Sequence, residues 1–375
     1  MNPFFQRLMR SATRLVGRGD LKAATAAIQQ ALAGKPESPP PASSAQVHPH
    51  ADVIDVAARV IEPAVVEPPV YEPPPMHEAP SPEPRPETDA LSLPDEQFIA
   101  GRYIGAGGQR EYKLYIPPHD GTRTLPLIVM LHGCTQDADD FAAGTAMNDL
   151  ARMHGFLVLY PEQSPRFNPN RCWNWFKHNH QARDRGEPAL IAGMTRQVMA
   201  QHAIDPARVY AAGLSAGGAM AAILGDAYPD LFAAVGVHSG LPTGAAKDVA
   251  SAFGAMKKAP QIVPATRNGV PTIVFHGDTD ATVDPANGRH VIAASVHASA
   301  QVETQTGVAA GGLRYTRELH RADGGPVTAE HWVVHGSPHA WSGGNSAGSY
   351  TDPRGPNASA EMVRFFMEHV REPVH

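Results

Sequence analysis

The hydrophobic and polar positions divide the chain into three regions. Apolar residues recur at a helical spacing in residues 1–34, follow no sustained pattern in residues 35–95, and form short runs between amphipathic stretches in residues 96–375. Short apolar runs bounded by turn residues indicate buried strands, and an apolar spacing of three or four residues indicates a helix that faces a core. We therefore expect the third region to be the folded domain.

The third region predicts strands that alternate with helices. The expected strands are Glu111–Ile116, Leu127–Leu131, Phe156–Tyr160, Val209–Gly213, Ala233–Val237, Thr272–His276, Leu313–Leu319 and His331–His335. The expected helices are 139–154, 188–203, 216–227, 285–299 and 357–370. Continuous apolar strands that alternate with helices are typical of a mostly parallel sheet with helices on both faces, so the expected fold class is α/β.

The first region predicts an amphipathic helical segment. Apolar residues follow an i, i+3, i+4 pattern over Phe5–Val16, Gly17 and Gly19 interrupt it, and Asp20 is placed to cap a second helix. Residues 1–34 are then either a helical hairpin packed on itself or on a partner, or a basic helix that binds an apolar or anionic surface.

The second region predicts a disordered linker. Residues 35–95 contain sixteen of the 36 prolines in the chain, and glutamates alternate with them. Proline lacks the backbone N–H that a sheet or helix needs, so this stretch should be an extended spacer between the helical segment and a catalytic domain at 96–375.

Charge and apolar run length argue against two classes of protein. The net charge is -6 and no basic patch with interleaved aromatic residues occurs in the third region, so we expect no nucleic-acid partner. No apolar run reaches the roughly 18 residues of a transmembrane helix. Residues 1–19 lack the apolar core of a signal peptide, which makes a cytoplasmic location the simplest expectation and an extracellular one the alternative.

A candidate nucleophile lies between a predicted strand and a predicted helix. Gly213-Leu214-Ser215-Ala216-Gly217 follows the strand Val209–Gly213 and leads into the helix 216–227. In a G-x-S-x-G turn of this kind the serine is held on a strained backbone, and the glycines avoid clashes with neighbouring backbone. We expect Ser215 to be the nucleophile of a serine hydrolase.

A serine nucleophile needs a base and an acid that orients the base, and in this type of site they follow the serine in the order acid, then histidine. Asp278, Asp280 and Asp284 all come after the strand that ends at His276. We choose Asp280, because the turn after Gly277 should return its side chain over the sheet. Asp284 is the best placed of the three to cap the helix that follows.

The predicted base is His339, on the loop after the last predicted strand. His331 and His335 lie within that strand and are expected to be structural. Chain order argues against His276 and His290, which come before or beside the acid.

An earlier loop is expected to complete the oxyanion hole. The strand Leu127–Leu131 leads into His132-Gly133-Cys134, so the backbone N–H groups of Cys134 and Ala216 are the predicted donors. We expect His132 to be a buried residue that holds this loop.

Aromatic residues near this loop have two interpretations. Trp173 and Trp175 either anchor the core or line an apolar acyl pocket, and Trp341, two residues after the predicted base, is a candidate substrate contact. The two cysteines are too few for a disulfide scaffold or a structural zinc site. A Cys134–Cys172 disulfide would join the aromatic segment to the oxyanion loop, but the sequence leaves open whether they pair.

Four segments together resemble the polyhydroxybutyrate (PHB) depolymerase family of esterases, which have the α/β-hydrolase fold. They are Leu131–Gln136, Cys172–Phe176, Gly213–Gly217 and His339–Gly344, and the resemblance covers residues 98 to 370. The family is similar to feruloyl and acetylxylan esterases. The resemblance implies a triad of Ser215, Asp280 and His339 that acts on oxygen esters without a metal or organic cofactor.

The resemblance also sets expectations for the substrate. Secreted members that attack crystalline polymer carry a further binding domain, which we do not expect in a chain that ends at His375. We expect hydrolysis of soluble hydroxybutyrate oligomers or amorphous granules, with residues 1–34 holding the enzyme on a granule surface. A feruloyl or acetylxylan esterase is the alternative, followed by a non-catalytic binding protein and then by a peptidase of the same fold.

Overall fold

A computed structural model describes residues 95–105, 108–260, 269–296, 299–321 and 324–372. The predicted helical segment at 1–34 and all of the predicted linker except Asp95 lie outside these residues.

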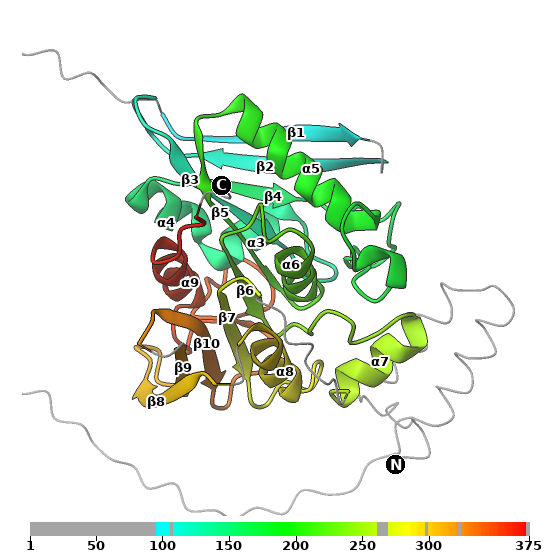
Figure 1. Ribbon diagram of the computed structural model, residues 1–375, viewed down its shortest axis with the longest axis vertical. Coiled ribbons are helices and arrows are strands. Elements are labelled where there is room, and N and C mark those ends of the chain that lie inside the picture. Colours follow the sequence, from blue (N-terminus) through cyan, green and yellow to red (C-terminus); the bar gives the residue numbers. More distant parts are fainter. Residues whose placement is uncertain (1–94, 106–107, 261–268, 297–298, 322–323, 373–375) are drawn as a thin grey trace, which may run out of the picture. The chain divides into compact units, whose positions relative to one another are not determined.

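A ten-stranded sheet runs through the described part of the chain (Figure 1). Its strand order is β1-β2-β4-β3-β5-β6-β7-β10-β9-β8. The strands from β4 to β10 in this order are parallel, and the pairs at both ends of the sheet are antiparallel. The strand bounds are β1 Gln97–Gly105, β2 Gly108–Ile116, β3 Leu125–Leu131, β4 Leu157–Pro161, β5 Ile204–Leu214, β6 Ala234–His238, β7 Thr272–Gly277, β8 Gln301–Val308, β9 Arg314–Arg321 and β10 Val327–Val334.

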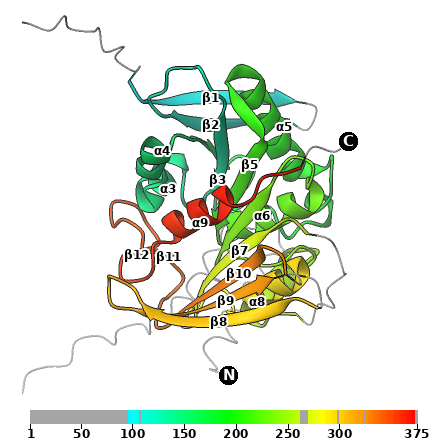
Figure 2. The same cartoon turned by 60° about the vertical axis from the view of Figure 1, so that its left-hand side comes forward.

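Helices cover both faces of this sheet (Figures 1 and 2). Strand β3 shows why, because all seven of its residues are buried. Leu127 and Val129 pack in the cluster that includes α5 and α6, whereas Ile128 packs with α3, α4 and α9 on the opposite face. The helix bounds are α3 Ala138–Thr145, α4 Met147–His154, α5 Gly186–Gln201, α6 Ala216–Ala227, α7 Val249–Lys257, α8 Ala286–Ser295 and α9 Ala358–Met367, with a 3₁₀ turn η1 at His178–His180.

The central strands and their helices agree with the pattern-based prediction, and the α/β-hydrolase fold is confirmed. The antiparallel strands β1 and β8 were not predicted, because they are exposed along most of their length and have no continuous apolar run. Helix α7 was also not predicted, although Asp248 and Ser251 form a capping box at its start. Strand β10 ends at Val334, so the prediction that His335 lies inside the strand is wrong.

The predicted single helix at 139–154 is wrong, because Ala146 divides it into α3 and α4. Ala146 has a left-handed backbone, with φ 50° and ψ 29°. A later segment of the chain is packed against this break: a Cβ on Gly348 would lie 2.4 Å from the Cα of Gly144, and the Asn345 N–H donates to the Gly144 carbonyl. The apolar periodicity of residues 139–154 has no interruption at Ala146. The break is found where residues 345–348 pack against the end of α3.

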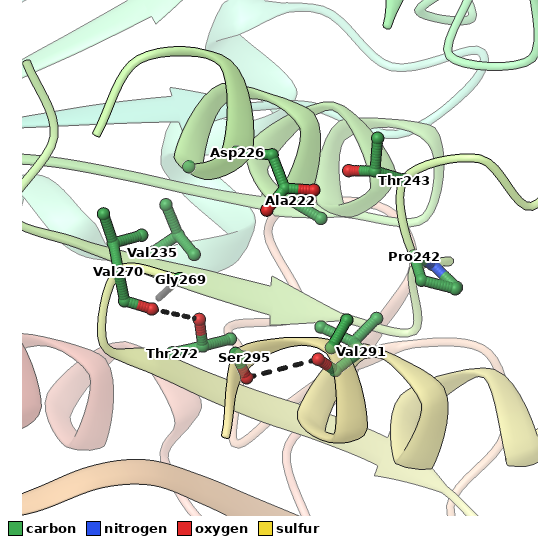
Figure 3. A pocket seen from close by; sticks show the side chains of 12 residues that line it. Ala222, Asp226, Val235, Pro242, Thr243, Gly269, Val270, Thr272, Val291 and Ser295 are labelled. Carbon is green, nitrogen blue, oxygen red and sulfur yellow. Dashed lines mark hydrogen bonds between the residues drawn. The ribbon is translucent and has the colours of Figure 1, made fainter. Parts of the chain in front are cut away.

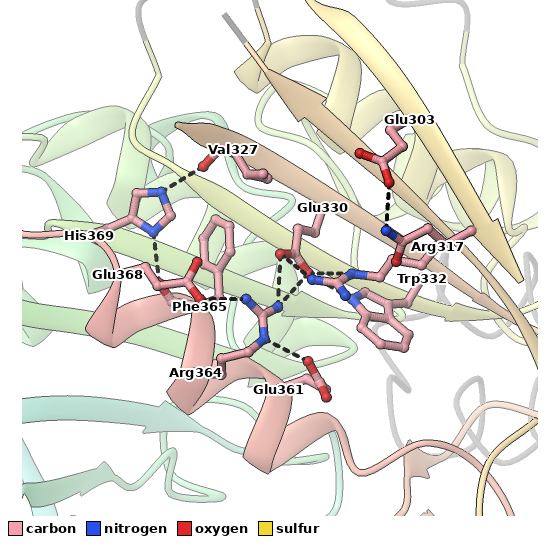
Figure 4. Close-up of polar contacts among 11 residues, drawn as sticks. Glu303, Arg317, Val327, Glu330, Trp332, Glu361, Arg364, Phe365, Glu368 and His369 are labelled. Carbon is pink, nitrogen blue, oxygen red and sulfur yellow. Dashed lines mark hydrogen bonds and ion pairs between the residues drawn. The ribbon is translucent and has the colours of Figure 1, made fainter. Parts of the chain in front are cut away.

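A buried carboxylate joins α9 to the sheet (Figure 4). Glu330 on β10 is 1% exposed and accepts hydrogen bonds from Arg317 at 2.8 Å and from Arg364 at 2.7 Å. The Trp332 indole donates to the same carboxylate at 3.1 Å. Burial raises the pKa of Glu330, but the two arginines more than offset this effect and lower it below its ordinary value. The carboxylate therefore stays charged and holds two partly exposed cations against the sheet.

We predict that Glu330→Ala lowers the free energy of unfolding by about 3 kcal/mol, because the buried carboxylate is lost together with its hydrogen bonds to Arg317, Arg364 and Trp332. Urea unfolding at neutral pH measures this change. Glu111→Ala is the control: it removes a 3.0 Å pair in which Arg102 is 57% exposed and Glu111 64% exposed, and it should cost less than about 1 kcal/mol. Equal effects of the two variants would contradict the prediction.

Candidate active site

Ser215 occupies a sharp turn between β5 and α6. Its backbone is strained, with φ 57° and ψ -115°, and its side chain is half-buried among fully buried neighbours. A Cβ on Gly213 would lie 2.4 Å from the backbone of Gly217, and one on Gly217 would lie 2.0 Å from the Leu131 carbonyl oxygen. Only glycine fits at both positions, so the strand can turn directly into the helix with the serine at its apex.

Asp280 and His339 meet at the same edge of the sheet. Asp280 follows β7, His339 follows the adjacent parallel strand β10, and His339 Nδ1 lies 2.6 Å from Asp280 Oδ2. The other carboxylate oxygen accepts the backbone N–H groups of Thr282 and Val283, each at 2.8 Å. Because the carboxylate accepts the Nδ1 proton, Nε2 of a neutral His339 is left free to act as a base.

The two competing aspartates have other partners. Asp278 binds His335 Nδ1 at 2.8 Å, and Thr316 Oγ1 lies 2.9 Å from the other nitrogen of that ring. Both nitrogens of His335 are therefore occupied. Asp284 accepts the Ala286 N–H at the start of α8, as its position before the helix predicted.

A second histidine, His276, also contacts Asp280. Chain order had argued against a role for His276 in the site. His276 Nε2 lies 3.3 Å from Asp280 Oδ2 and 3.0 Å from the Val283 carbonyl oxygen. Burial raises the pKa of Asp280, but hydrogen bonds from His276 and His339 outweigh it and hold that pKa well below its ordinary range. The acid is therefore ionised at neutral pH.

His238, which the sequence did not single out, connects the serine turn to the histidine loop. Its carbonyl accepts the Ser215 N–H at 2.8 Å, and its Nε2 accepts the Ser342 N–H at 2.9 Å. Ser342 lies three residues after His339, so one residue at the end of β6 holds both loops. Burial, with smaller contributions from His276 and His339, lowers the pKa of His238 to about 3, which keeps Nε2 unprotonated as an acceptor.

The predicted oxyanion loop lies against the serine turn. Within the described ranges, no hydrogen bond engages the backbone N–H of Cys134 or of Ala216. His132 holds the loop as expected: its Nδ1 lies 2.7 Å from the Gly133 carbonyl oxygen, and its Nε2 accepts the Gln163 N–H at 3.1 Å. Burial lowers the pKa of His132 to about 4, so the ring is neutral in this role.

A disulfide joins Cys134 to Cys172, which answers the question that the sequence left open. The Thr135 N–H also donates to the Asn170 carbonyl at 2.7 Å. The stretch from Asn170 to Cys172, which leads into the aromatic residues, is therefore attached to the oxyanion loop at two points.

The three tryptophans are packed in the core. Trp173, Trp175 and Trp341 are 0%, 5% and 1% exposed. The Trp341 indole donates to Ser359 Oγ at 3.0 Å, and its ring stacks on His238 with centroids 5.0 Å apart. The positions of Trp173 and Trp175 correspond to the core-anchor interpretation, and the burial of Trp341 leaves almost none of its surface for the substrate contact that was expected of it.

One small pocket lies away from these residues. It is formed between α6, β6 and α8, where Thr243, Asp226 and Ser295 lie among apolar side chains (Figure 3). Its volume is about 20 Å³, which is room for about one water molecule. In the part of the chain that is described, no cluster of three or more side chains is arranged to bind a metal, and no helix is both long and apolar enough to cross a membrane.

The described residues have the α/β-hydrolase fold and place the Ser215 turn, Asp280 and His339 at one edge of its sheet. The chain belongs to the Esterase PHB depolymerase family, whose sequence pattern it matches over residues 110–318. It is 38% identical over 180 residues to poly(3-hydroxyalkanoate) depolymerase C of Paucimonas lemoignei, covering 44% of this chain and 43% of that protein. It is 35% identical over 140 residues to feruloyl esterase B of Thermothelomyces thermophilus, covering 37% of this chain and 47% of that protein.

A solved structure, the acetyl xylan esterase of Aspergillus awamori, shares the fold. It superposes with a TM-score of 0.56 at 17% identity over 72% of this chain and 99% of its own. The chain spans less than half the length of the two curated relatives described above.

We predict that the neutral state of His238 makes the fold sensitive to mild acid. A histidine with a lowered folded-state pKa stays neutral while the unfolded chain takes up the proton, so stability falls as the pH drops below about 6.5. Asparagine at this position does not titrate, so the variant lacks this source of acid sensitivity. The loss of unfolding free energy between pH 7 and pH 5 should be about 2 kcal/mol smaller in His238→Asn than in the wild type.

Urea unfolding at the two pH values tests this prediction. His178→Asn, at an exposed position, is the control and should keep the wild-type loss. If His238→Asn loses as much stability as the wild type, the ring is not held neutral by the fold.

Proposed function

We propose that the chain is a serine esterase that hydrolyses short-chain hydroxyalkanoate esters, such as poly- or oligo-3-hydroxybutyrate, through an acyl-enzyme on Ser215. The observation that carries this proposal is the bond between His339 Nδ1 and Asp280 at the sheet edge where the Ser215 turn also lies. The nucleophile, the base and the acid then have the roles that the chain order predicts.

In the first half-reaction, Ser215 Oγ attacks the carbonyl carbon of the ester as His339 Nε2 takes the serine proton. The tetrahedral intermediate collapses, the bond from carbon to the alcohol oxygen breaks, and His339 returns the proton to the leaving alkoxide. Water then repeats these steps on the acyl-enzyme and releases the acid. Ionised Asp280 stabilises the imidazolium that forms in each step.

The negative charge on the carbonyl oxygen needs donors that are already in place. The N–H groups of Ala216 and Cys134 suit this role, because they have no other partner among the described residues and flank the serine turn. Each donor of this kind contributes about 3–4 kcal/mol to the transition state. The disulfide at Cys134 supports this role, because it limits the freedom of the loop.

The acyl group of the substrate is proposed from the similarity to known esterases and not from the catalytic residues. The 38% identity to a polyhydroxyalkanoate depolymerase favours hydroxyalkanoate esters. The 35% identity to a feruloyl esterase supports a carbohydrate esterase as the second candidate. The catalytic groups would serve either substrate, since both reactions form an acyl-enzyme on a serine.

Of the two expected locations, we propose the extracellular one. Disulfides persist in oxidising compartments and are rare in the cytosol, and Cys134 and Cys172 are paired. The disulfide favours this location over the cytoplasmic one expected from residues 1–19.

We predict that the wild-type enzyme hydrolyses the hydroxybutyrate trimer and p-nitrophenyl butyrate faster than methyl ferulate or acetylated xylan. Product release from the four substrates, measured as kcat/KM, tests the acyl preference. Ser215→Ala should lose activity on all four. Preferential cleavage of ferulate would contradict the proposed substrate, and activity retained by Ser215→Ala would contradict the proposed mechanism.

We predict that Asp280→Asn lowers kcat by roughly 10³- to 10⁴-fold, because the amide favours the wrong tautomer of His339. Asp278→Asn is the matched control, since Asp278 pairs with a histidine of its own and is 39% exposed. It should keep kcat within about fivefold of the wild type. Steady-state kinetics on p-nitrophenyl butyrate separate the two, and a larger loss in Asp278→Asn would reverse the assignment of the acid.

A further inference from the structure

Tyr350 lies between the two loops of the proposed active site. It is one of seven non-glycine residues with a positive φ among the described residues, at 53°. Thr135, next to the proposed oxyanion donor Cys134, is another, at 70°. The Tyr350 hydroxyl lies 3.1 Å from Thr135 Oγ1, so two strained residues from distant parts of the chain contact each other. Strained bulky residues persist only where their surroundings hold them, and they concentrate at functional sites.

The direction of this hydrogen bond follows from the available protons. Thr135 Oγ1 donates its single proton to the Cys134 carbonyl at 2.6 Å. The Tyr350 hydroxyl must therefore be the donor to Thr135 Oγ1. Its proton is committed to the oxyanion loop, and the ring is fixed beside that loop.

The backbone of Tyr350 is attached to the loop of the proposed base. The Trp341 N–H donates to the Tyr350 carbonyl at 2.6 Å, and Trp341 lies two residues after His339. The neighbouring residue strengthens the link, because Gln136 Nε2 donates to the Ser349 carbonyl at 3.1 Å. Gln136 also accepts the Gly133 N–H at 2.9 Å. The pair Ser349-Tyr350 therefore joins the histidine loop to the oxyanion loop.

Tyr350 also presents an aromatic surface to solvent. It is 47% exposed, whereas Trp341, Trp173 and Trp175 are buried. A tyrosine ring is a rigid apolar surface that loses little conformational entropy when a ligand packs on it. A ring fixed between the proposed base and the proposed oxyanion donor lies where the groups attached to the ester would extend.

We propose that Tyr350 is a substrate-contacting residue that determines specificity: the aliphatic chain of the ester packs on its ring, and the bond to Thr135 holds the ring in place. The inference rests on the proposed function at Ser215. It names the part of the site that selects the acyl chain of the substrate. The ligand class is an ester with an apolar aliphatic acyl chain.

Chain-length preference tests this role. Kinetics are measured on p-nitrophenyl acetate, butyrate and hexanoate with the wild type, Tyr350→Phe and Tyr350→Ala. Tyr350→Ala should raise KM for the hexanoate about threefold to tenfold and change KM for the acetate less than about twofold, because only the longer chain reaches the ring. Tyr350→Phe keeps the ring and should keep the wild-type order of KM values.

The hydroxyl is tested separately through its partner. Tyr350→Phe and Thr135→Val each remove the bond and should each lower kcat about threefold to tenfold, and the double variant should lose no more than either single variant. Ile104→Ala, on β1 and at a residue that is 70% exposed, is the control for an exposed apolar truncation and should change neither kcat nor chain preference. Thermal unfolding establishes that each variant is folded.

The outcomes separate this inference from the proposed function. If Tyr350→Ala affects all three esters equally, Tyr350 is only structural and the inference is overturned, while an inactive Ser215→Ala leaves the proposed function intact. If Ser215→Ala retains activity on these esters, the proposed function fails and this inference fails with it. Selective loss of the hexanoate together with an inactive Ser215→Ala supports both.

Discussion

The site depends on one close backbone approach, between the Ser215 turn and the end of β3. At Gly217 the Leu131 carbonyl oxygen lies 2.0 Å from where a Cβ would be, and at Gly213 the backbone of Gly217 is similarly close. This steric constraint lets β5 turn directly into α6 and holds Ser215 at the carboxyl end of the parallel strands. Asp280 and His339 follow β7 and β10 at the same edge, so the parallel sheet brings three distant residues together.

Buried neutral histidines then hold the loops that carry the chemistry. His238 binds the serine turn with its carbonyl and the histidine loop with its ring, and His132 binds within the oxyanion loop. Each must stay unprotonated to accept a backbone N–H, and burial ensures this by lowering its pKa. These two neutral histidines hold the loops in place at neutral pH. The stability of the fold therefore depends on pH.

Much of the fold could be predicted because the central strands are buried on both faces. Strand β3 is apolar throughout, and its boundaries were predicted to within two residues. Strands β1 and β8 were missed, because an exposed edge strand has no apolar run to identify it. The break at Ala146 was also missed, since a segment about 200 residues later packs against it. Sequence periodicity reports local burial and carries no information about such distant contacts.

The sequence by itself determined the serine turn, the order of serine, acid and histidine, and the family, because these depend on local spacing and chain order. Only the tertiary structure decided that Asp280, and not Asp278, contacts His339, since each aspartate finds a different histidine across the sheet edge. It also shows that Cys134 pairs with Cys172, that Trp173, Trp175 and Trp341 are buried, and that Tyr350 contacts Thr135. These contacts join residues far apart in the chain, and packing fixes them where composition and spacing do not.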